Sequence, residues 1–366
     1  MKSFSTPESA VGALDVRLPY AALVTGWLDV LLEKSPDVRI VRVDHHDAGD
    51  GSLLDLAMKD PEVRRIVVDL ANKAFFVYSC REGTTSFVHY SHIGSLWQRV
   101  RDGEFKVDER GLVYSLAQPL AGLSPTRLVV VFSAMAKHIR GPYLMRHFEQ
   151  NFATLQKYLP PGTAVLRIAD FGGVVGGYYM NSHGLPDNET NVQALIRDVV
   201  AALDLEDDDV VLYGPGKGGS AALYHGMLGR FRVLATDPIV ADEHYVRFHN
   251  DSHFTVGVFP ADKKDKFQEL SASLGAGDVP PMAIICSDRS PQFPYITTVI
   301  QEPVQAKIAF FNSRHVDIKT HPDVLLKTIN LTVMLLSMML YKVPLEPGIS
   351  IVDEVRHRED LGSRAI

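Results

Sequence analysis

The sequence predicts an α/β protein with a doubly wound, mostly parallel sheet and a smaller α/β part at its N-terminus. Six short, largely apolar segments have the length of buried strands. Helical stretches lie between several of them, as expected when helices cover both faces of a parallel sheet. One strand also runs through a glycine-packed turn into a helix, which is typical of such folds at a functional site.

The main part of the chain follows this alternation in order. The predicted helices are residues 192–203 and 220–228, and the predicted strands are residues 127–132, 164–169, 209–213, 232–236, 282–287 and 307–312. This region, residues 123–346, is predicted to form one domain with reactive groups at the carboxyl ends of its strands.

The remaining segments are assigned by composition. Residues 1–122 are predicted to form the smaller part, with a helix at 20–34 and strands at 38–43, 65–70 and 75–79. Turn residues at 120–126 suggest the boundary, and apolar residues on both sides suggest that the two parts pack together. Residues 347–366 turn charged and are interpreted as a C-terminal tail.

Composition excludes several functional classes. The chain has 366 residues, a formal net charge of −7 and no basic run, which argues against nucleic-acid binding. No signal-like N-terminus is visible, and the apolar run 329–340 is too short to span a bilayer, so we expect a cytoplasmic protein without membrane partners. Cys80 and Cys286 form no metal-binding pair, and neither a metal nor another cofactor is predicted.

The glycine-packed turn has the outline of a nucleophile elbow without the nucleophile. An elbow of the form Gly-x-Ser-x-Gly needs small residues two before and two after the serine, because the turn is sharp. Gly214 and Gly218 meet that spacing, and Gly216 stands where the serine is expected. The amides of Gly216 and Lys217 open a helix and direct a positive partial charge into the predicted pocket.

Other strand ends carry further candidates. Ser133 and Ala134 follow the first strand, where a hydrolase supplies an oxyanion-hole amide, and Asp288 and His315 follow the last two. Elbow, acid and histidine therefore occur in the chain order of the α/β-hydrolase fold, which predicts Asp288 and His315 as an acid–base pair.

Each candidate has a structural alternative. Asp288 could only cap a turn, and Lys217 could bind an anion, act as an amine or be a solvated turn residue. His321 competes with His315, but Thr320 and Asp323 around it are typical of a helix start, which favours a structural role. Ser133 could be a nucleophile, although an oxyanion role is favoured.

Two more segments are candidates for binding. The glycine-rich segment 170–179 could bring Tyr178 and Tyr179 to the pocket, or those tyrosines could pack in the core. Residues 44–47, Asp-His-His-Asp, have metal-ligand composition, but neighbours on an extended segment point to opposite faces, which argues against one shared ion.

Segments 129–133, 168–170 followed by 176–179, and 213–223 are distinctive in combination. Together they resemble the XcbB/CpsF family of capsular polysaccharide biosynthesis proteins and related accessory secretion proteins with a hydrolase fold. The resemblance covers about residues 127–340. The elbow of that family usually reads Tyr-Gly-Ser-Ser-Lys-Gly-Gly, whereas in this chain Pro215 and Gly216 replace both serines. The resemblance implies the fold and makes Asp288 and His315 plausible partners, but serine-based acyl transfer does not carry over.

Two functions follow from these observations. The first is a biosynthetic enzyme that acts on a small carbonyl or carboxylate compound by acid–base and oxyanion catalysis without an elbow serine, as a lyase, hydratase, isomerase, cyclase or water-activating hydrolase. A variant of it places covalent chemistry on Ser133 or Lys217. The second is a non-catalytic scaffold that binds a glycan or a partner protein. Association into a homo-oligomer is compatible with either.

Overall fold

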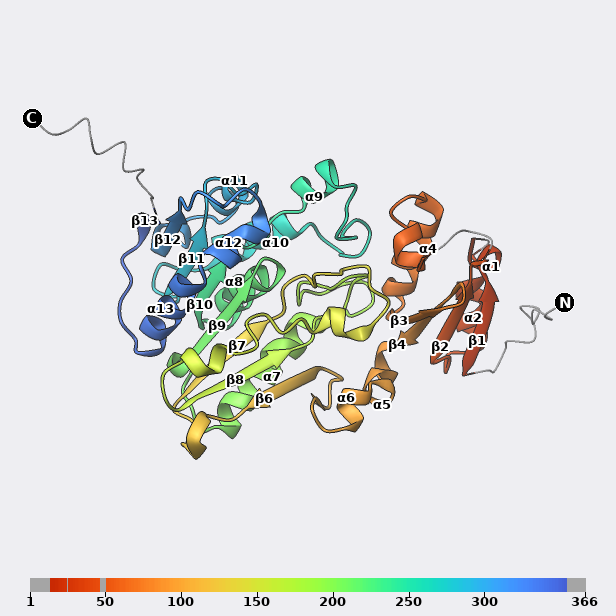
Figure 1. The fold of residues 1–366 in the computed structure, drawn as a ribbon, viewed down its shortest axis with the longest axis horizontal. Coiled ribbons are helices and arrows are strands. Elements are labelled where there is room, and N and C mark those ends of the chain that lie inside the picture. Colours follow the sequence, from red (N-terminus) through yellow and green to blue (C-terminus); the bar gives the residue numbers. More distant parts are fainter. Residues whose placement is uncertain (1–13, 25, 47–50, 354–366) are drawn as a thin grey trace, which may run out of the picture.

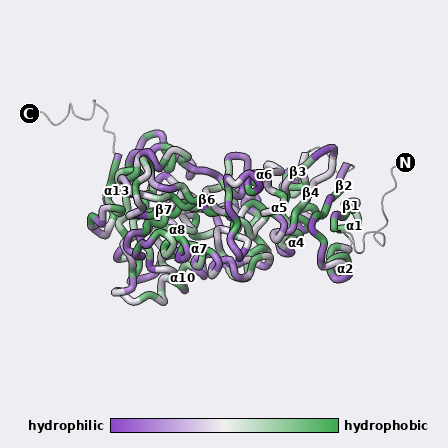
Figure 2. Tube along the Cα trace, turned by 90° about the horizontal axis from the view of Figure 1, so that it is seen from below, coloured by the Kyte–Doolittle hydropathy of each residue, from purple (hydrophilic) through white to green (hydrophobic). Residues whose placement is uncertain are grey.

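The computed structural model describes residues 14–24, 26–46 and 51–353. They form a small mixed sheet and a large, mostly parallel sheet. The two sheets lie at opposite ends of an elongated molecule, as two perpendicular views show (Figures 1 and 2). The α/β class predicted from the sequence is confirmed.

The large sheet has nine strands among the described residues, in the order β13-β12-β11-β10-β9-β7-β8-β6-β5. Neighbours from β13 to β8 are parallel, and β6 and β5 join antiparallel. The six strands predicted from the sequence all exist, each within two residues of its predicted ends. The strands are β5 (Lys106–Val107), β6 (Val113–Ala117), β7 (Arg127–Phe132), β8 (Thr163–Ile168), β9 (Val210–Pro215), β10 (Arg232–Thr236), β11 (Met282–Cys286), β12 (Ile308–Ser313) and β13 (Gly348–Val352).

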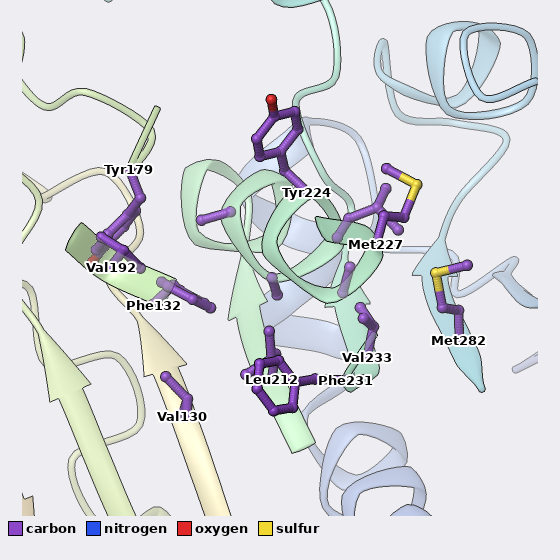
Figure 3. Close-up of a cluster of buried hydrophobic side chains, with 14 of the residues drawn as sticks. Val130, Phe132, Tyr179, Val192, Leu212, Tyr224, Met227, Phe231, Val233 and Met282 are labelled. Carbon is purple, nitrogen blue, oxygen red and sulfur yellow. The ribbon is translucent and has the colours of Figure 1, made fainter. Parts of the chain in front are cut away.

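Helices cover both faces of this sheet. Leu212 of β9 packs in a core with the helices on one face (Figure 3), whereas its neighbours Val211 and Tyr213 pack on the other face, because successive strand residues point to opposite sides. The first face holds α7 (Asn188–Ala202), α8 (Lys217–Gly229) and α10 (Lys263–Ser273), and the second holds α12 (His321–Lys327) and α13 (Ile329–Leu340). Shorter helices α9 (Glu243–Phe248) and α11 (Phe293–Ile296) lie in connections.

The apolar run 329–340 forms helix α13. None of the described helices is both long and apolar enough to cross a membrane alone. Only α12 and α13 taken together reach the necessary length and hydropathy, and a bend of 68° separates them.

The small sheet has the order β1-β2-β4-β3. Its strands β1 (Asp15–Pro19) and β4 (Thr84–His89) were not predicted, and the predicted helix 20–34 is two helices. One predicted element is also of the wrong type. Residues 65–70, predicted as a strand, belong to helix α4, which begins at Pro61 after Asp60 accepts hydrogen bonds from two amides of its first turn. The capped start and the helical spacing of its buried residues explain the difference. The elements are β1 (Asp15–Pro19), α1 (Tyr20–Val24), α2 (Trp27–Lys34), β2 (Ile40–Asp44), α3 (Leu53–Leu56), α4 (Pro61–Asn72), β3 (Phe75–Arg81), β4 (Thr84–His89), α5 (Ile93–Leu96) and α6 (Gln98–Arg101).

Two predicted boundaries also differ from the structure. β5 and β6 precede the predicted boundary at residue 122 but pair into the large sheet, because β6 lies beside β8. Within the predicted tail, β13 is the edge strand of that sheet and pairs with β12. Residues 354–366 lie outside the described residues.

The small and large sheets are joined by a buried arginine. Arg146 donates hydrogen bonds to the carbonyl of Val77 in β3 at 2.8 Å and to that of Val174 at 3.0 Å. Burial without a carboxylate partner among the described residues lowers the pKa of its guanidinium to about 9. The aromatic rings of Phe76 and Phe171 pack against each other at the same junction, with their centroids 5.3 Å apart.

Candidate active site

The turn between β9 and α8 has the backbone conformation of an elbow. Gly216 has φ +53° and ψ −116°, a region that residues with a side chain rarely adopt. A Cβ atom on Gly214 would lie 2.3 Å from the carbonyl of Gly218, so the spacing of small residues is a steric requirement. Where the sequence predicts an elbow, the chain therefore makes a tight turn from strand to helix, and the central residue of this turn carries no side chain.

His321 faces this empty position. Its Nδ1 atom lies 2.7 Å from Oδ2 of Asp237, and its Nε2 atom lies 2.9 Å from where a Cβ atom on Gly216 would stand. The side chain of Asp237 is 2% exposed and that of His321 is 14% exposed. An imidazole oriented by a carboxylate therefore points at the centre of the elbow.

Local structure explains both positions. Asp237 follows β10 directly, has φ +45°, and donates its amide to the carbonyl of Ile285 in the neighbouring strand at 2.7 Å. The hydroxyl of Ser290 also donates to Oδ2 of Asp237. His321 is the first residue of α12, and the capping box of Thr320 and Asp323 predicted there is present. The cap fixes the backbone, which leaves the His321 ring free to turn inward.

The predicted pair of His315 and Asp288 is not formed, and this corrects the sequence interpretation. Oδ2 of Asp288 accepts from Arg314 at 3.0 Å and from Asn312 at 3.2 Å. Nδ1 of His315 accepts from the amide of Asp317 at 3.2 Å. Asp288 follows β11 and Arg314 follows the neighbouring strand β12, so the two strand ends bring Asp288 to Arg314 and not to His315.

A cavity of about 1280 Å³ opens above the elbow. Its floor includes Gly216, Lys217, Asp237 and His321, and Ala134 lies in its wall as the sequence predicted. The segment 244–253, which follows β10, supplies a further wall of aromatic and histidine rings. Its apolar walls are Met135, Ile139, Phe152, Ile239, Leu325 and Leu326, and the ring-bearing wall is His244, Tyr245, His249 and His253.

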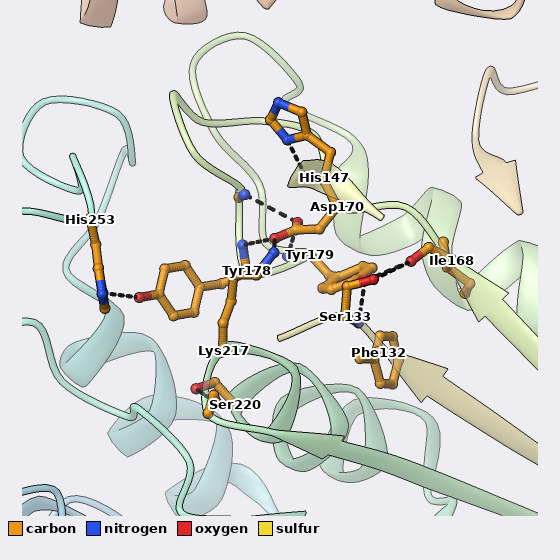
Figure 4. A network of polar contacts seen from close by, with 12 residues as sticks. Phe132, Ser133, His147, Ile168, Asp170, Tyr178, Tyr179, Lys217, Ser220 and His253 are labelled. Carbon is orange, nitrogen blue, oxygen red and sulfur yellow. Dashed lines mark hydrogen bonds and ion pairs between the residues drawn. The ribbon is translucent and has the colours of Figure 1, made fainter. Parts of the chain in front are cut away.

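Lys217 contributes backbone rather than an ammonium group to this cavity. Its side chain is fully buried and forms an ion pair with Asp170, which is also fully buried (Figure 4). Asp170 further accepts the amides of Gly177, Tyr178 and Tyr179, at 2.9–3.1 Å. The predicted role of the Lys217 side chain in ligand binding is therefore wrong, because the group organises the glycine-rich segment from inside.

Ser133 and Tyr179 are structural as well. The hydroxyl of Tyr179 donates to the carbonyl of Ile168 at 2.7 Å and accepts from the amide of Ser133 at 2.8 Å (Figure 4). Both residues are buried outside the cavity lining. The Ser133 amide is thus already used, and Ala134 and Met135 are the residues of this loop that reach the cavity.

Tyr178 is likewise buried behind the cavity wall. Its hydroxyl lies 2.9 Å from Nδ1 of His253, and it does not line the cavity itself. The predicted direct contact with substrate is therefore not supported. Both tyrosines have positive φ, which the three amide bonds to Asp170 hold in place.

The predicted weakness of residues 44–47 as a metal site can be examined in part. His45 is buried with Nε2 2.8 Å from the hydroxyl of Thr85, and His46 lies beside Asp44 at 3.2 Å. Asp47 lies outside the described residues. Among the residues that the structure describes, no group of three or more histidine, cysteine or carboxylate side chains is arranged to hold a metal ion.

One signal for the pair of His321 and Asp237 was present in the sequence. Asp237 directly follows the predicted strand 232–236, so the strand-end rule that singled out Asp288 applies equally to it. His321 was identified but assigned only to a helix start. Of the wall residues, His244 and Tyr245 lie in the short helix α9, and His249 and His253 follow it. No element was predicted for this segment.

Comparisons with known proteins give likenesses of fold. No family model and no curated protein matches the chain. Among solved structures, an esterase from Rhizomucor miehei matches at 12% identity and TM-score 0.46, covering 70% of this chain and 92% of the esterase. An esterase from Thermogutta terrifontis matches at 14% identity and TM-score 0.43, covering 67% of this chain and 96% of the esterase. A fluorophosphonate-binding serine hydrolase from Staphylococcus aureus matches at 11% identity and TM-score 0.44, covering 64% of this chain and 96% of the hydrolase. At these identities they establish no activity or substrate for this chain.

Proposed function

We propose that this chain is an enzyme that uses His321 and Asp237 for acid–base catalysis on a small carbonyl or carboxylate compound, without an elbow nucleophile. The carrying observation is the position of His321, between Asp237 and the open space above Gly216. Suitable reactions are those of a lyase, hydratase, isomerase or cyclase, or hydrolysis by an activated water.

The hydrogen bond to Asp237 gives His321 the protonation pattern of a base. Nδ1 donates its proton to the carboxylate of Asp237, which leaves the lone pair on Nε2 directed at the cavity. Nε2 can take a proton from a water or from a carbon next to a carbonyl, and the imidazolium formed is stabilised by Asp237. No covalent bond to the protein is needed.

Backbone amides supply the complementary stabilisation. Lys217 is the first residue of the 13-residue helix α8, so its amide lies at the positive end of the helix and at the cavity floor. Ala134 and Met135 follow β7 on the opposite side. A negative oxygen that develops between them is favoured in the place where a hydrolase holds its oxyanion.

The cavity mouth favours an anionic substrate. Lys137, Arg289 and Lys319 line it and are exposed, whereas Glu149 is the one acidic side chain of the lining besides Asp237. This excess of positive charge contrasts with the net charge of −7 for the whole chain. Together with the apolar walls, it supports a carboxylate attached to an apolar body.

A scaffold that binds a glycan or a partner protein is the second candidate. The close approach of His321 to Gly216 favours it, because it leaves no room for a serine side chain without movement. The open cavity counts against it, since a scaffold has no need of an oriented base facing solvent. A role in capsule biosynthesis, and a cytoplasmic location, stay predictions that rest on the sequence.

The test compares two histidine variants. The purified chain is incubated with a panel of carboxylate and carbonyl metabolites, and depletion is followed by mass spectrometry for wild type, His321→Ala and His315→Ala. We expect turnover to be lost in His321→Ala and kept in His315→Ala. Equal loss in both variants contradicts the assignment of His321, and no depletion by the wild-type chain favours the scaffold.

A further inference from the structure

A second histidine faces the same cavity as His321. His253 lines the cavity, and its ring stacks on that of Tyr245 with centroids 3.8 Å apart. The ring of Tyr245 also meets the ring of His321 edge-on, with the ring centroids 6.4 Å apart. Two imidazoles therefore contact one tyrosine, and both line the cavity above the elbow.

The partner of His253 determines which ring nitrogen carries the proton. Nδ1 of His253 lies 2.9 Å from the hydroxyl of Tyr178 (Figure 4), and among the described residues that hydroxyl has no other hydrogen-bond partner. Burial raises the pKa of Tyr178 well above its usual value, so the hydroxyl keeps its proton. It therefore donates to Nδ1, and a neutral imidazole that accepts at Nδ1 carries its proton on Nε2.

The surroundings keep His253 uncharged. Burial, and then the nearby ammonium of Lys263, lower the pKa of His253 well below its usual value. Lys263 is held in place, because its Nζ lies 3.2 Å from the ring centroid of Tyr178 and 2.5 Å from Oδ1 of Asp242. A second proton on His253 would add a charge beside this fixed cation.

We propose that His253 is a substrate-binding residue whose Nε2–H donates a hydrogen bond to a carbonyl or carboxylate oxygen of the substrate. Tyr178 acts through it as a positioning residue that fixes the proton on Nε2. The inference rests on the proposed function and divides the work between the two imidazoles: His321 accepts a proton and His253 polarises the oxygen. A neutral imidazole suits this second task, because it donates without competing for the proton being moved.

The proton position is tested first, in the full chain labelled with ¹⁵N-histidine. Long-range ¹H–¹⁵N spectra at pH 8, with His253 assigned from the His253→Gln variant, are expected to show a protonated Nε2 and an unprotonated Nδ1. Tyr178→Phe keeps the ring above which Lys263 lies and removes only the hydroxyl, so the proton should then distribute over both nitrogens. A proton on Nδ1 in the wild-type chain overturns the inference.

Ligand contact is tested next with benzoate, a carboxylate on an apolar ring. Saturating benzoate should shift the His253 Nε2–H signal, and His253→Gln should raise the Kd about tenfold. Exposed His183, outside the cavity lining, provides the control variant His183→Gln, which should leave the Kd unchanged. An unmoved signal, or an unchanged Kd in His253→Gln, overturns the proposal.

This design separates the two proposals, because benzoate binding needs no turnover. If benzoate shifts the His253 signal but the wild-type chain turns over no compound, the contact of His253 with a carboxylate is supported and the proposed function is contradicted. If turnover is lost in His321→Ala but unchanged in His253→Gln, the proposed function is supported and the substrate contact of His253 is contradicted.

Discussion

Nε2 of His321 lies 2.9 Å from the point where a side chain on Gly216 would begin. In a serine hydrolase fold that point belongs to the nucleophile, and the histidine acts on it. Here the imidazole itself borders the cavity floor, with Nδ1 held by Asp237 at 2.7 Å. Because Gly216 has no side chain, nothing at this position separates the imidazole from the cavity.

Replacing Asp237 by Asn should slow turnover by about 10²–10⁴-fold, the range typical of general acid–base catalysis. The amide can keep its oxygen toward His321 and Ser290, since Oδ1 of Asp237 is buried without a hydrogen-bond partner among the described residues. The loss would come from the charge that stabilises the imidazolium. Steady-state kcat measures it, and thermal unfolding should change little.

Asp288→Asn is the matched control for this variant, because Asp288 pairs with Arg314 at the surface and does not line the cavity. Its kcat should equal that of the wild-type chain. A larger loss in Asp288→Asn than in Asp237→Asn would restore the pair first predicted from the sequence.

Gly216→Ser should impair the native reaction and lower stability by about 1–3 kcal/mol, the usual cost of a residue with a side chain in a strained conformation. The serine would displace His321 and fill the floor of the cavity. With a base beside it, the new hydroxyl should react with a fluorophosphonate that leaves the wild-type elbow unlabelled. Mass spectrometry of the labelled peptide and the melting temperature report the two effects.

Gly277→Ser provides the comparison, since a side chain at Gly277 meets open space and its φ is not positive. This variant should match the wild-type chain in melting temperature and activity. A Gly216→Ser protein with full native activity would show that the space above Gly216 is not used by the substrate.

Lys217→Met should destabilise the fold by about 3–5 kcal/mol, because it leaves the buried charge of Asp170 without its counter-ion. The same substitution at Arg65, which forms an exposed pair with Glu62, should have little effect. Denaturant unfolding monitored by circular dichroism measures both. Equal stabilities of the two variants would mean that the three amide bonds to Asp170 suffice.

The strands and the elbow could be predicted because their causes are local. Alternation of apolar runs and helices sets the sheet, and the steric contact between Gly214 and Gly218 sets the turn. The buried pair of Lys217 and Asp170 could not be predicted in this way. Its members lie 47 positions apart, and nothing in either segment indicates the other.

The histidine that faces the elbow could not be chosen from the sequence for a related reason. His315 and His321 both follow β12 within a few residues, and only the course of the chain between them decides which ring reaches the elbow. The helix-start pattern at Thr320 was correctly identified, but a cap engages the backbone and the capping side chains, and does not determine where the next ring points. At His321 a helix start and an inward-facing ring occur together.

The chain should lose stability in acid through its buried histidines, and His225 offers the clearest test. Its Nδ1 accepts from Gln193 at 3.0 Å and its Nε2 donates to the carbonyl of Tyr179 at 3.0 Å, so the folded state binds the neutral ring. Burial lowers the pKa of His225 to about 4. Because the unfolded chain takes up this proton near pH 6.5 and the folded chain does not, stability falls as the pH drops from about 6.5 to about 4.

This shift corresponds to roughly 3 kcal/mol, lost in full by about pH 4 and fully present above pH 6.5. His225→Gln should be less stable than the wild-type chain at pH 7.5 but should lose about that much less between pH 7.5 and 4. Other buried histidines contribute equally to both proteins and cancel in the difference, and His183→Gln should follow the wild-type pH profile. Urea unfolding at several pH values gives the pH dependence of the free energy of unfolding for both proteins. Parallel profiles for His225→Gln and wild type would exclude His225 as the source of this loss of stability in acid.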